Sequence, residues 1–234
     1  PMSVYFPIPL FEWCGFGQLP VSVVRASGVL LLLGLLCAAS GTFTRLALTV
    51  SWIAFFFFYG TVLGFEKPEP NALSFYTYHY NNVVFFILLI LSAAPGIGVW
   101  GVDAVRKRGW AEVSGFWRQA TVPTVPTWPL TLIKLTLALA YFGAGFTKLL
   151  SSGVWWADGY TLQAYFLMKH LQEGAWPGYC LAQSYWGCVI ASLGTLALEL
   201  TFLVVPFLRS NSPLMWGYVC AGLGFHLMIA VTMS

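Results

Sequence analysis

The sequence predicts an all-α fold, a polytopic membrane bundle with about six visible transmembrane helices. The 234 residues are 59% hydrophobic and only 8% charged, whereas soluble domains carry about 25% charged residues. Apolar runs long enough to cross a bilayer recur along the chain. The formal net charge of +3 is small, and no basic patch with interleaved aromatics is present. We therefore expect membrane lipid as a partner and no nucleic acid.

The apolar runs divide the chain into spans joined by loops. We expect residues 1–234 to form a single transmembrane domain. Because the chain starts at Pro1 and ends at Ser234 within an apolar run, we expect a fragment truncated at both ends. The predicted spans are about Val21 to Ala39, Phe43 to Gly64, Tyr80 to Val99, Leu130 to Leu150, Tyr185 to Leu208 and Leu214 to Met233.

The loops differ in their content of lysine and arginine, which predicts the orientation. Arg45, the run Arg106 to Arg108 and Arg209 fall on one side of a six-span chain, and basic loops face the cytoplasm. The loop at residues 151–184 is then periplasmic or lumenal, in a bacterial inner membrane or the endoplasmic reticulum. This loop is long enough for a short amphipathic or re-entrant helix around Thr161 to Leu171.

Lys148 places a cation near the end of the fourth span. It is either an anchor that snorkels to the membrane surface or a working group inside the bundle. Gly143, Ala144 and Gly145 precede it, and small residues permit close helix packing, which favours the second interpretation. A desolvated lysine that loses its proton can act as a base. Such a cation contributes little to stability, so removing it is expected to stop turnover and leave folding almost intact.

Two further ionisable residues are embedded in the last two spans. His226 lies in GLGFHLMIA and Glu199 in LALELTF. Exposing either to lipid costs roughly 2–4 kcal/mol on insertion scales, so we expect both to point into the bundle. His226 is either a packing histidine or a functional one. Glu199 either pairs with a cation, is protonated, or contacts substrate.

Polar and aromatic residues also gather at the predicted outer ends of the third and fourth spans. His79, Asn81 and Asn82 begin the third span and either bond between helices or bind substrate. Trp155 and Trp156 form either an interfacial belt or a substrate platform. No paired histidine ligands, phosphate-binding loop or CxxC is present, so we expect no metal site.

The stretch YFGAGFTKLLSSGVWWADGYTL resembles the region around the catalytic lysine of vitamin K-dependent gamma-carboxylase. It also resembles bacterial proteins with the same membrane region, the HTTM (horizontally transferred transmembrane) domain. YHYNNVV is similar to an Asn-Asn-His stretch of that family, although Val83 stands where the carboxylase has histidine, and FHLM is similar to its second embedded histidine segment. The matching positions are Tyr141-Phe142, Ala144-Gly145, Lys148-Leu149, Trp155/Trp156 and Gly159-Tyr160.

The resemblance implies a lyase that couples quinol oxidation by O2 to carboxylation of glutamate or another carbon acid. Lys148 would be the base toward reduced vitamin K or another quinol, with CO2 as co-reactant and no metal. A peptide or small molecule would be carboxylated. Two alternatives stay open: a non-enzymatic quinone- or lipid-binding or assembly module, and a small proton-coupled transporter. The expected site residues are Lys148 and His226 for catalysis, and His79, Asn81, Asn82, Tyr141, Trp155, Trp156 and Glu199 for substrate binding.

Overall fold

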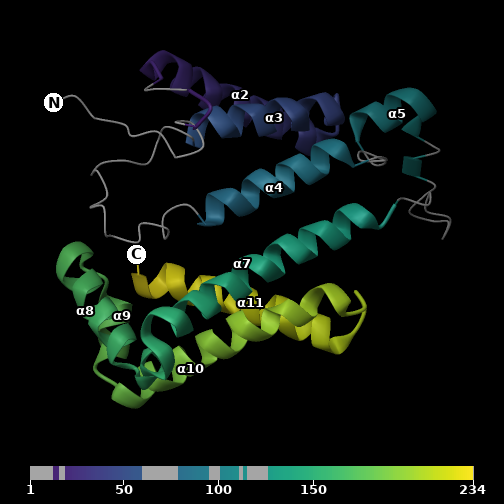
Figure 1. Ribbon diagram of the computed structural model, residues 1–234. Coiled ribbons are helices and arrows are strands. Elements are labelled where there is room, and N and C mark those ends of the chain that lie inside the picture. The colour runs from purple at the N-terminus through teal and green to yellow at the C-terminus, as the bar shows by residue number, and fades with distance from the viewer. Residues whose placement is uncertain are drawn as a thin grey trace. The chain divides into compact units, whose positions relative to one another are not determined.

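The computed structural model describes residues 13–15, 19–59, 79–94, 101–110, 113–114 and 126–233, without the side chains of residues 79–81 and 233. These residues are mostly helical and contain no strand (Figure 1). The predicted all-α fold class is thus confirmed. The chain divides into two units, Pro1–Ile133 and Lys134–Ser234, and each is described by itself.

The first unit begins with a helical hairpin. Helix α2 (Val21–Ser40) turns into α3 (Thr44–Tyr59) at Gly41. Gly41 has φ 72°, and its N–H donates to the carbonyl of Ala38 across 3.1 Å. Glycine suits this left-handed end of a helix because it has no Cβ to clash.

Two further helices complete the described part of the first unit. Helix α4 (His79–Ala93) packs against α3 through a small apolar core of Leu48, Phe55 and Leu88. The short helix α5 (Val102–Arg108) is held to the hairpin turn, because the N–H of Asp103 donates to the carbonyl of Gly41 across 3.0 Å.

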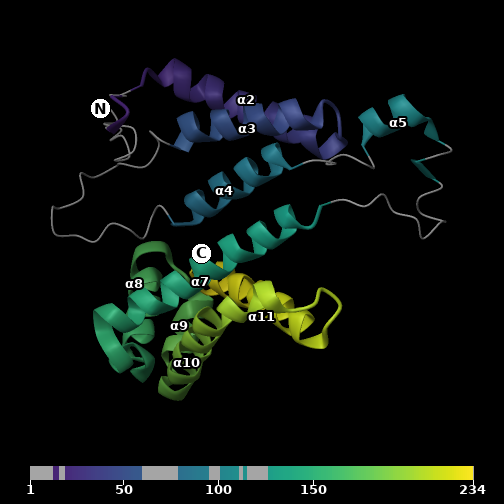
Figure 2. The same ribbon diagram turned by 45° about the vertical axis from the view of Figure 1, so that its right-hand side comes forward.

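The second unit contains three long apolar segments and a pair of short helices between the first two of them (Figure 2). α10 continues without a break into the 3-10 segment η3, so the two form one span. The elements are α7 (Trp128–Ser152, which enters the unit at Lys134), η2 (Gly153–Asp158), α8 (Tyr160–Glu173), α9 (Trp176–Ala182), α10 (Tyr185–Thr201), η3 (Phe202–Phe207) and α11 (Pro213–Met233).

Two cores hold the second unit together. Phe166, Ala182 and Cys188 pack where α8, α9 and the start of α10 meet. Farther along the bundle, Ala138 of α7 packs with Phe202 and Val205 of η3. The first core joins the helix pair to α10, and the second joins α7 to the α10–η3 span, with Met215 and Tyr218 of α11 packed against it.

The helices agree with the predicted spans in position and partly in length. The described residues include four helical segments long and apolar enough to cross a membrane: Val21–Ser40, Trp128–Asp158, Tyr185–Phe207 and Pro213–Thr232. Helices α3 and α4 lie in the other two predicted runs and are shorter. With 16 residues, α3 is about 24 Å long. The predicted continuations at residues 60–64 and 95–99 lie outside the described residues.

Candidate functional site

Lys148 of α7 forms an ion pair with Glu199 of α10. Its Nζ donates a short hydrogen bond to Glu199 Oε1. The Lys148 side chain is 17% exposed and that of Glu199 is 5% exposed. The ammonium is therefore bonded inside the bundle and does not snorkel away from it. Of the alternatives left open for Glu199, the structure shows pairing with a cation, and its partner is Lys148.

A glycine lets α7 and α10 approach closely enough for this pair. A Cβ at Gly145 would lie 2.9 Å from Glu199 Cβ and 3.3 Å from Leu200 Cγ, too close for any other residue without a shift. Gly143 has open space at the corresponding position, and Ala144 is exposed. Of the three small residues before Lys148, Gly145 is thus the one at which the helices meet.

This contact predicts the effect of adding a single methyl group to α7. Gly145→Ala is expected to lower the free energy of unfolding by about 1–3 kcal/mol, because the new Cβ overpacks the contact with Glu199. Gly143→Ala is the matched control and should leave stability unchanged or raise it by up to about 1 kcal/mol. Unfolding in mixed micelles, followed by circular dichroism, measures both. Equal effects at the two glycines would contradict the assigned contact.

The two adjacent tryptophans occupy different environments. Lys148 Nζ lies 4.8 Å from the ring centroid of Trp156, a distance at which an aromatic face attracts a cation. Trp155 is 74% exposed, as expected of a side chain in an interfacial belt. Trp156 is thus the tryptophan that joins the Lys148 site.

The second carboxylate oxygen of Glu199 is free to accept a hydrogen bond. Oε2 is buried and has no hydrogen-bond partner among the described residues. A buried carboxylate oxygen without a partner is costly, so this oxygen is suited to accept a hydrogen bond from a bound hydroxyl. No pattern in the sequence indicates this free oxygen, because an embedded glutamate is compatible with one or with two paired oxygens.

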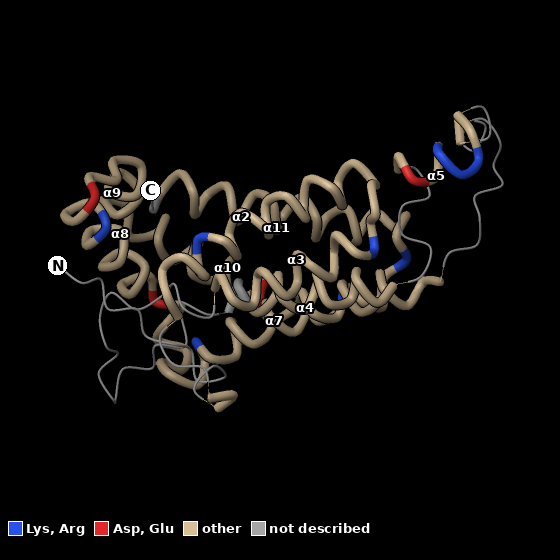
Figure 3. The backbone as a smooth tube through the Cα atoms, turned by 90° about the horizontal axis from the view of Figure 1, so that it is seen from above, with Lys and Arg blue, Asp and Glu red and all other residues tan. Residues whose placement is uncertain are grey.

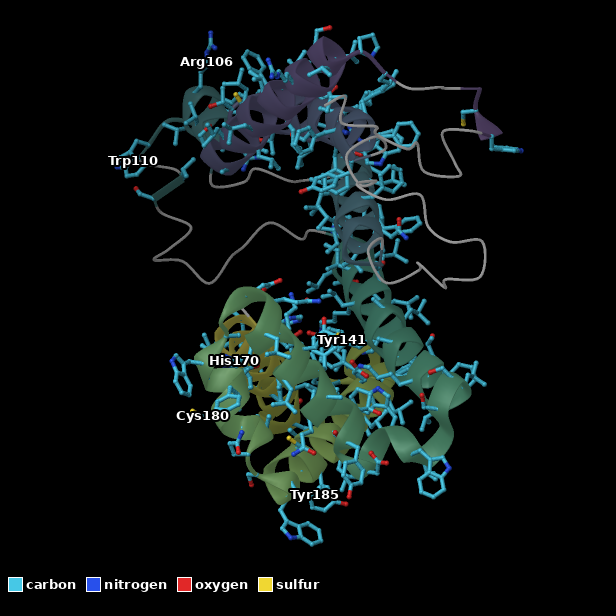
Figure 4. All side chains as sticks on the ribbon, turned by 90° about the vertical axis from the view of Figure 1, so that its left-hand side faces the viewer. Arg106, Trp110, Tyr141, His170, Cys180 and Tyr185 are labelled. Carbon is cyan, nitrogen blue, oxygen red and sulfur yellow. The ribbon has the colours of Figure 1, made fainter. Side chains whose placement is uncertain are left out.

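A second polar contact lies deeper in the same bundle, two turns before Lys148 on α7. The Tyr141 hydroxyl is hydrogen-bonded to Nε2 of His226 across 2.6 Å. The Tyr141 ring stacks on Phe202, with centroids 4.2 Å apart and planes 11° apart. Figure 4 shows Tyr141 among the helices of the second unit. This stacking partner was not predicted, and no pattern in the sequence indicates it.

The expectation that both embedded residues point into the bundle holds for one of them. Glu199 is only 3% exposed. His226 is exposed, although its ring is bonded to Tyr141. The His226 side chain is therefore bonded to α7 and still exposed, so it is less buried than predicted.

The remaining predicted substrate-binding residues belong to the first unit. His79, Asn81 and Asn82 lie in the first turn of α4. The side chains of His79 and Asn81 are outside the described residues, and Asn82 is exposed. Their assignment to the site stays a prediction. Within the described part of the chain, no group of three His, Cys, Asp or Glu residues is placed to hold a metal ion.

The fold and the buried pair define a class: an integral membrane protein with a charge pair inside a helical bundle. The model of the HTTM domain matches residues 3–233. The chain therefore belongs to the HTTM domain family, and this domain is found in vitamin K-dependent carboxylase-like membrane proteins. No curated protein and no solved structure matches the chain.

Proposed function

We propose that this protein is a carboxylase-like membrane enzyme in which Lys148 takes a proton from a quinol. The observation that carries the proposal is the Lys148–Glu199 pair inside the bundle. Family membership supports the substrate class, since the HTTM domain occurs in carboxylase-like proteins. The carbon acid would be a glutamate in a peptide, or a small molecule.

The pair offers a route to a neutral amine. If the proton on Lys148 Nζ moves to Glu199, both groups become neutral and no buried charge is left. Away from water a charged pair loses most of its hydration, so the neutral pair lies closer in energy to the charged pair than it would in solution. A neutral amine held in this way can accept a phenolic proton as a general base. The Trp156 face would then stabilise the ammonium that forms.

The residues present fit a quinol. Before the proton transfer, the buried Oε2 of Glu199 can accept a hydrogen bond from a quinol hydroxyl and so hold it at the site. Lys148 can then receive the proton of that hydroxyl. Trp156 supplies an aromatic surface beside the amine. When bound, the quinol supplies the electrons that reduce O2 and the strong base needed for CO2 to add to the carbon acid.

Oxygen uptake tests the proposed function. The purified protein in lipid nanodiscs should consume O2 when reduced vitamin K is added, and should incorporate labelled CO2 when a glutamate peptide is also present. Empty nanodiscs correct for spontaneous quinol oxidation. Binding of the quinol without oxidation would instead support the non-enzymatic quinone-binding module.

A proton-coupled transporter is the second candidate function. It is favoured by the Tyr141–His226 contact, which is a second pair of hydrogen-bonded polar side chains in the bundle that contains the Lys148–Glu199 pair. Solute uptake into proteoliposomes that depends on a pH gradient and not on quinol would select this candidate.

We place the α8 end of the second unit on the periplasmic or lumenal side. Figure 3 shows the basic residues of α5, and this segment precedes the opposite end of α7. A cysteine replacing Gln172 in α8 should react with an impermeant maleimide from outside, because basic loops stay in the cytoplasm. A cysteine replacing Asn211, next to Arg209, should react only after the membrane is opened. Both residues are exposed. The reverse pattern would overturn the orientation.

A further inference from the structure

We propose that α8 lies in the plane of the membrane, with an apolar stripe of the helix seated on the lipid. The stripe consists of Tyr160, Ala164, Leu167 and Leu171, called here the α8 stripe. The inference concerns how the protein meets the bilayer, and it does not depend on the proposed enzymatic activity.

The direction of α8 is the first argument. In Figure 1, α8 and α9 run across the end of the bundle that α7, α10 and α11 form within the second unit. Spans run along the membrane normal, so a helix that crosses their ends lies near the membrane plane. A re-entrant helix would instead run alongside the spans.

The chain connections place α8 at the membrane surface. The span that contains α7 and η2 ends at Asp158 and α10 starts at Tyr185, so both of these span ends adjoin the α8–α9 pair. The end of α11 is at the same level, because a Cβ at Gly178 of α9 would collide with the carbonyl oxygen of Thr232. Three span termini thus meet the helix pair.

One side of α8 is taken by protein. Phe166 is 2% exposed and packs with Ala182 and Cys188, and Leu162 adds to this core. Gln163 Nε2 donates to the carbonyl of Ala182 across 2.6 Å. This side fixes the rotation of the helix about its own axis.

The α8 stripe occupies a second side and is exposed. Its residues follow a spacing of four, three and four, so they line one face of a helix. Tyr160 is 61% exposed and Leu171 is 84% exposed. A contiguous apolar face of this kind is unfavourable in water.

The third side of α8 carries both polar and apolar residues. Thr161 and Gln172 are exposed there, beside Tyr165 and Met168, which are 43% and 51% exposed. Lys169, next to the side that packs on protein, donates to Glu173 across 2.6 Å. This hydrogen bond raises the pKa of Lys169, so its ammonium stays charged at neutral pH and needs water or lipid headgroups around it. A helix with one side against protein, an exposed apolar stripe and polar or charged residues beyond the stripe matches one that lies at a membrane interface.

Aromatic residues mark the same level on the neighbouring elements. Trp155 precedes α8, and Trp186 begins α10 with 71% of its surface exposed. The rings of Tyr160, the first residue of α8, and Tyr185, the first residue of α10, have centroids 5.1 Å apart. Tryptophan and tyrosine gather at headgroup level because their rings are amphipathic.

The position of α8 also sets the depth of the Lys148–Glu199 pair. At Gly159, which precedes α8, an added Cβ would lie 2.8 Å from the backbone nitrogen of Val189, so α8 starts level with Val189. From residue 189 to residue 199 the axis of α10 advances about 15 Å. This is roughly half of the hydrocarbon core. A ligand of the pair would therefore reach it within the acyl-chain region, as a lipophilic molecule.

Spin labels on the full-length chain in nanodiscs test the proposal. In a background with the native cysteines replaced, nitroxides at Ala164 and Leu171 are compared with labels at the controls Thr161 and Gln172. Collision with O2 should exceed collision with a water-soluble nickel complex several-fold at the stripe, and the ratio should reverse at the controls. Equal nickel access at all four positions would place the stripe in water, and protection from both reagents at the stripe would place it against protein. Either result overturns the proposal.

A second measurement needs no substitution. A lipid-soluble diazirine should label Tyr160 and Leu171 of the unaltered protein and spare Gln172, as read from peptide masses. Absence of label on the α8 stripe would contradict the proposal even if the cysteine-free background failed to fold. Neither measurement uses quinol, so a failure here is separate from a failure of the proposed function.

Discussion

Lys148→Arg is expected to lower quinol-dependent O2 uptake roughly 10²–10⁴-fold, the contribution typical of a general base. A guanidinium can keep the charge pair with Glu199, and its planar donors suit a carboxylate. It stays protonated, however, and cannot take a proton from the substrate. The rate per milligram of folded protein in nanodiscs measures the effect.

The matched control for this variant is Lys169→Arg in α8. Lys169 also pairs with a glutamate, but it lies outside the bundle site, so oxygen uptake should be unchanged. Full activity of Lys148→Arg would remove Lys148 from the role of base and leave a binding module as the better interpretation.

Lys148→Met is expected to lower the free energy of unfolding by about 3–5 kcal/mol, the usual cost of leaving one partner of a buried pair alone. This revises the sequence-based expectation that folding would be almost unaffected, because Glu199 is only 3% exposed and would lose its cation. The double variant Lys148→Met/Glu199→Leu should recover most of the loss, since it leaves no buried charge.

A double-mutant cycle in mixed micelles measures this coupling. Glu199→Leu alone completes the cycle and should also destabilise, because it strands the ammonium of Lys148. If the two single losses simply add in the double variant, the pair contributes no coupling energy and the contact between α7 and α10 rests on packing alone.

Local sequence was sufficient for the four long spans, the family and the short helix in the loop. Apolar runs predicted the position of each long helix in the described part of the chain, and the helix expected around Thr161 to Leu171 is α8, Tyr160–Glu173. The motif around Lys148 predicted the HTTM family, which the family match confirms. These features depend on residues close together in the chain, where hydropathy and spacing carry the information.

The pairings inside the bundle were decided by tertiary structure. Lys148 meets Glu199 across 51 positions, and Tyr141 meets His226 across 85. The sequence placed each of these four residues in an apolar span, but it did not show which residue of another helix would be its partner. Hydropathy does not fix the rotation or the axial register of one helix against another. In this protein the contact of Gly145 with Glu199 helps to set that register, and it brings a lysine and a carboxylate together inside the membrane.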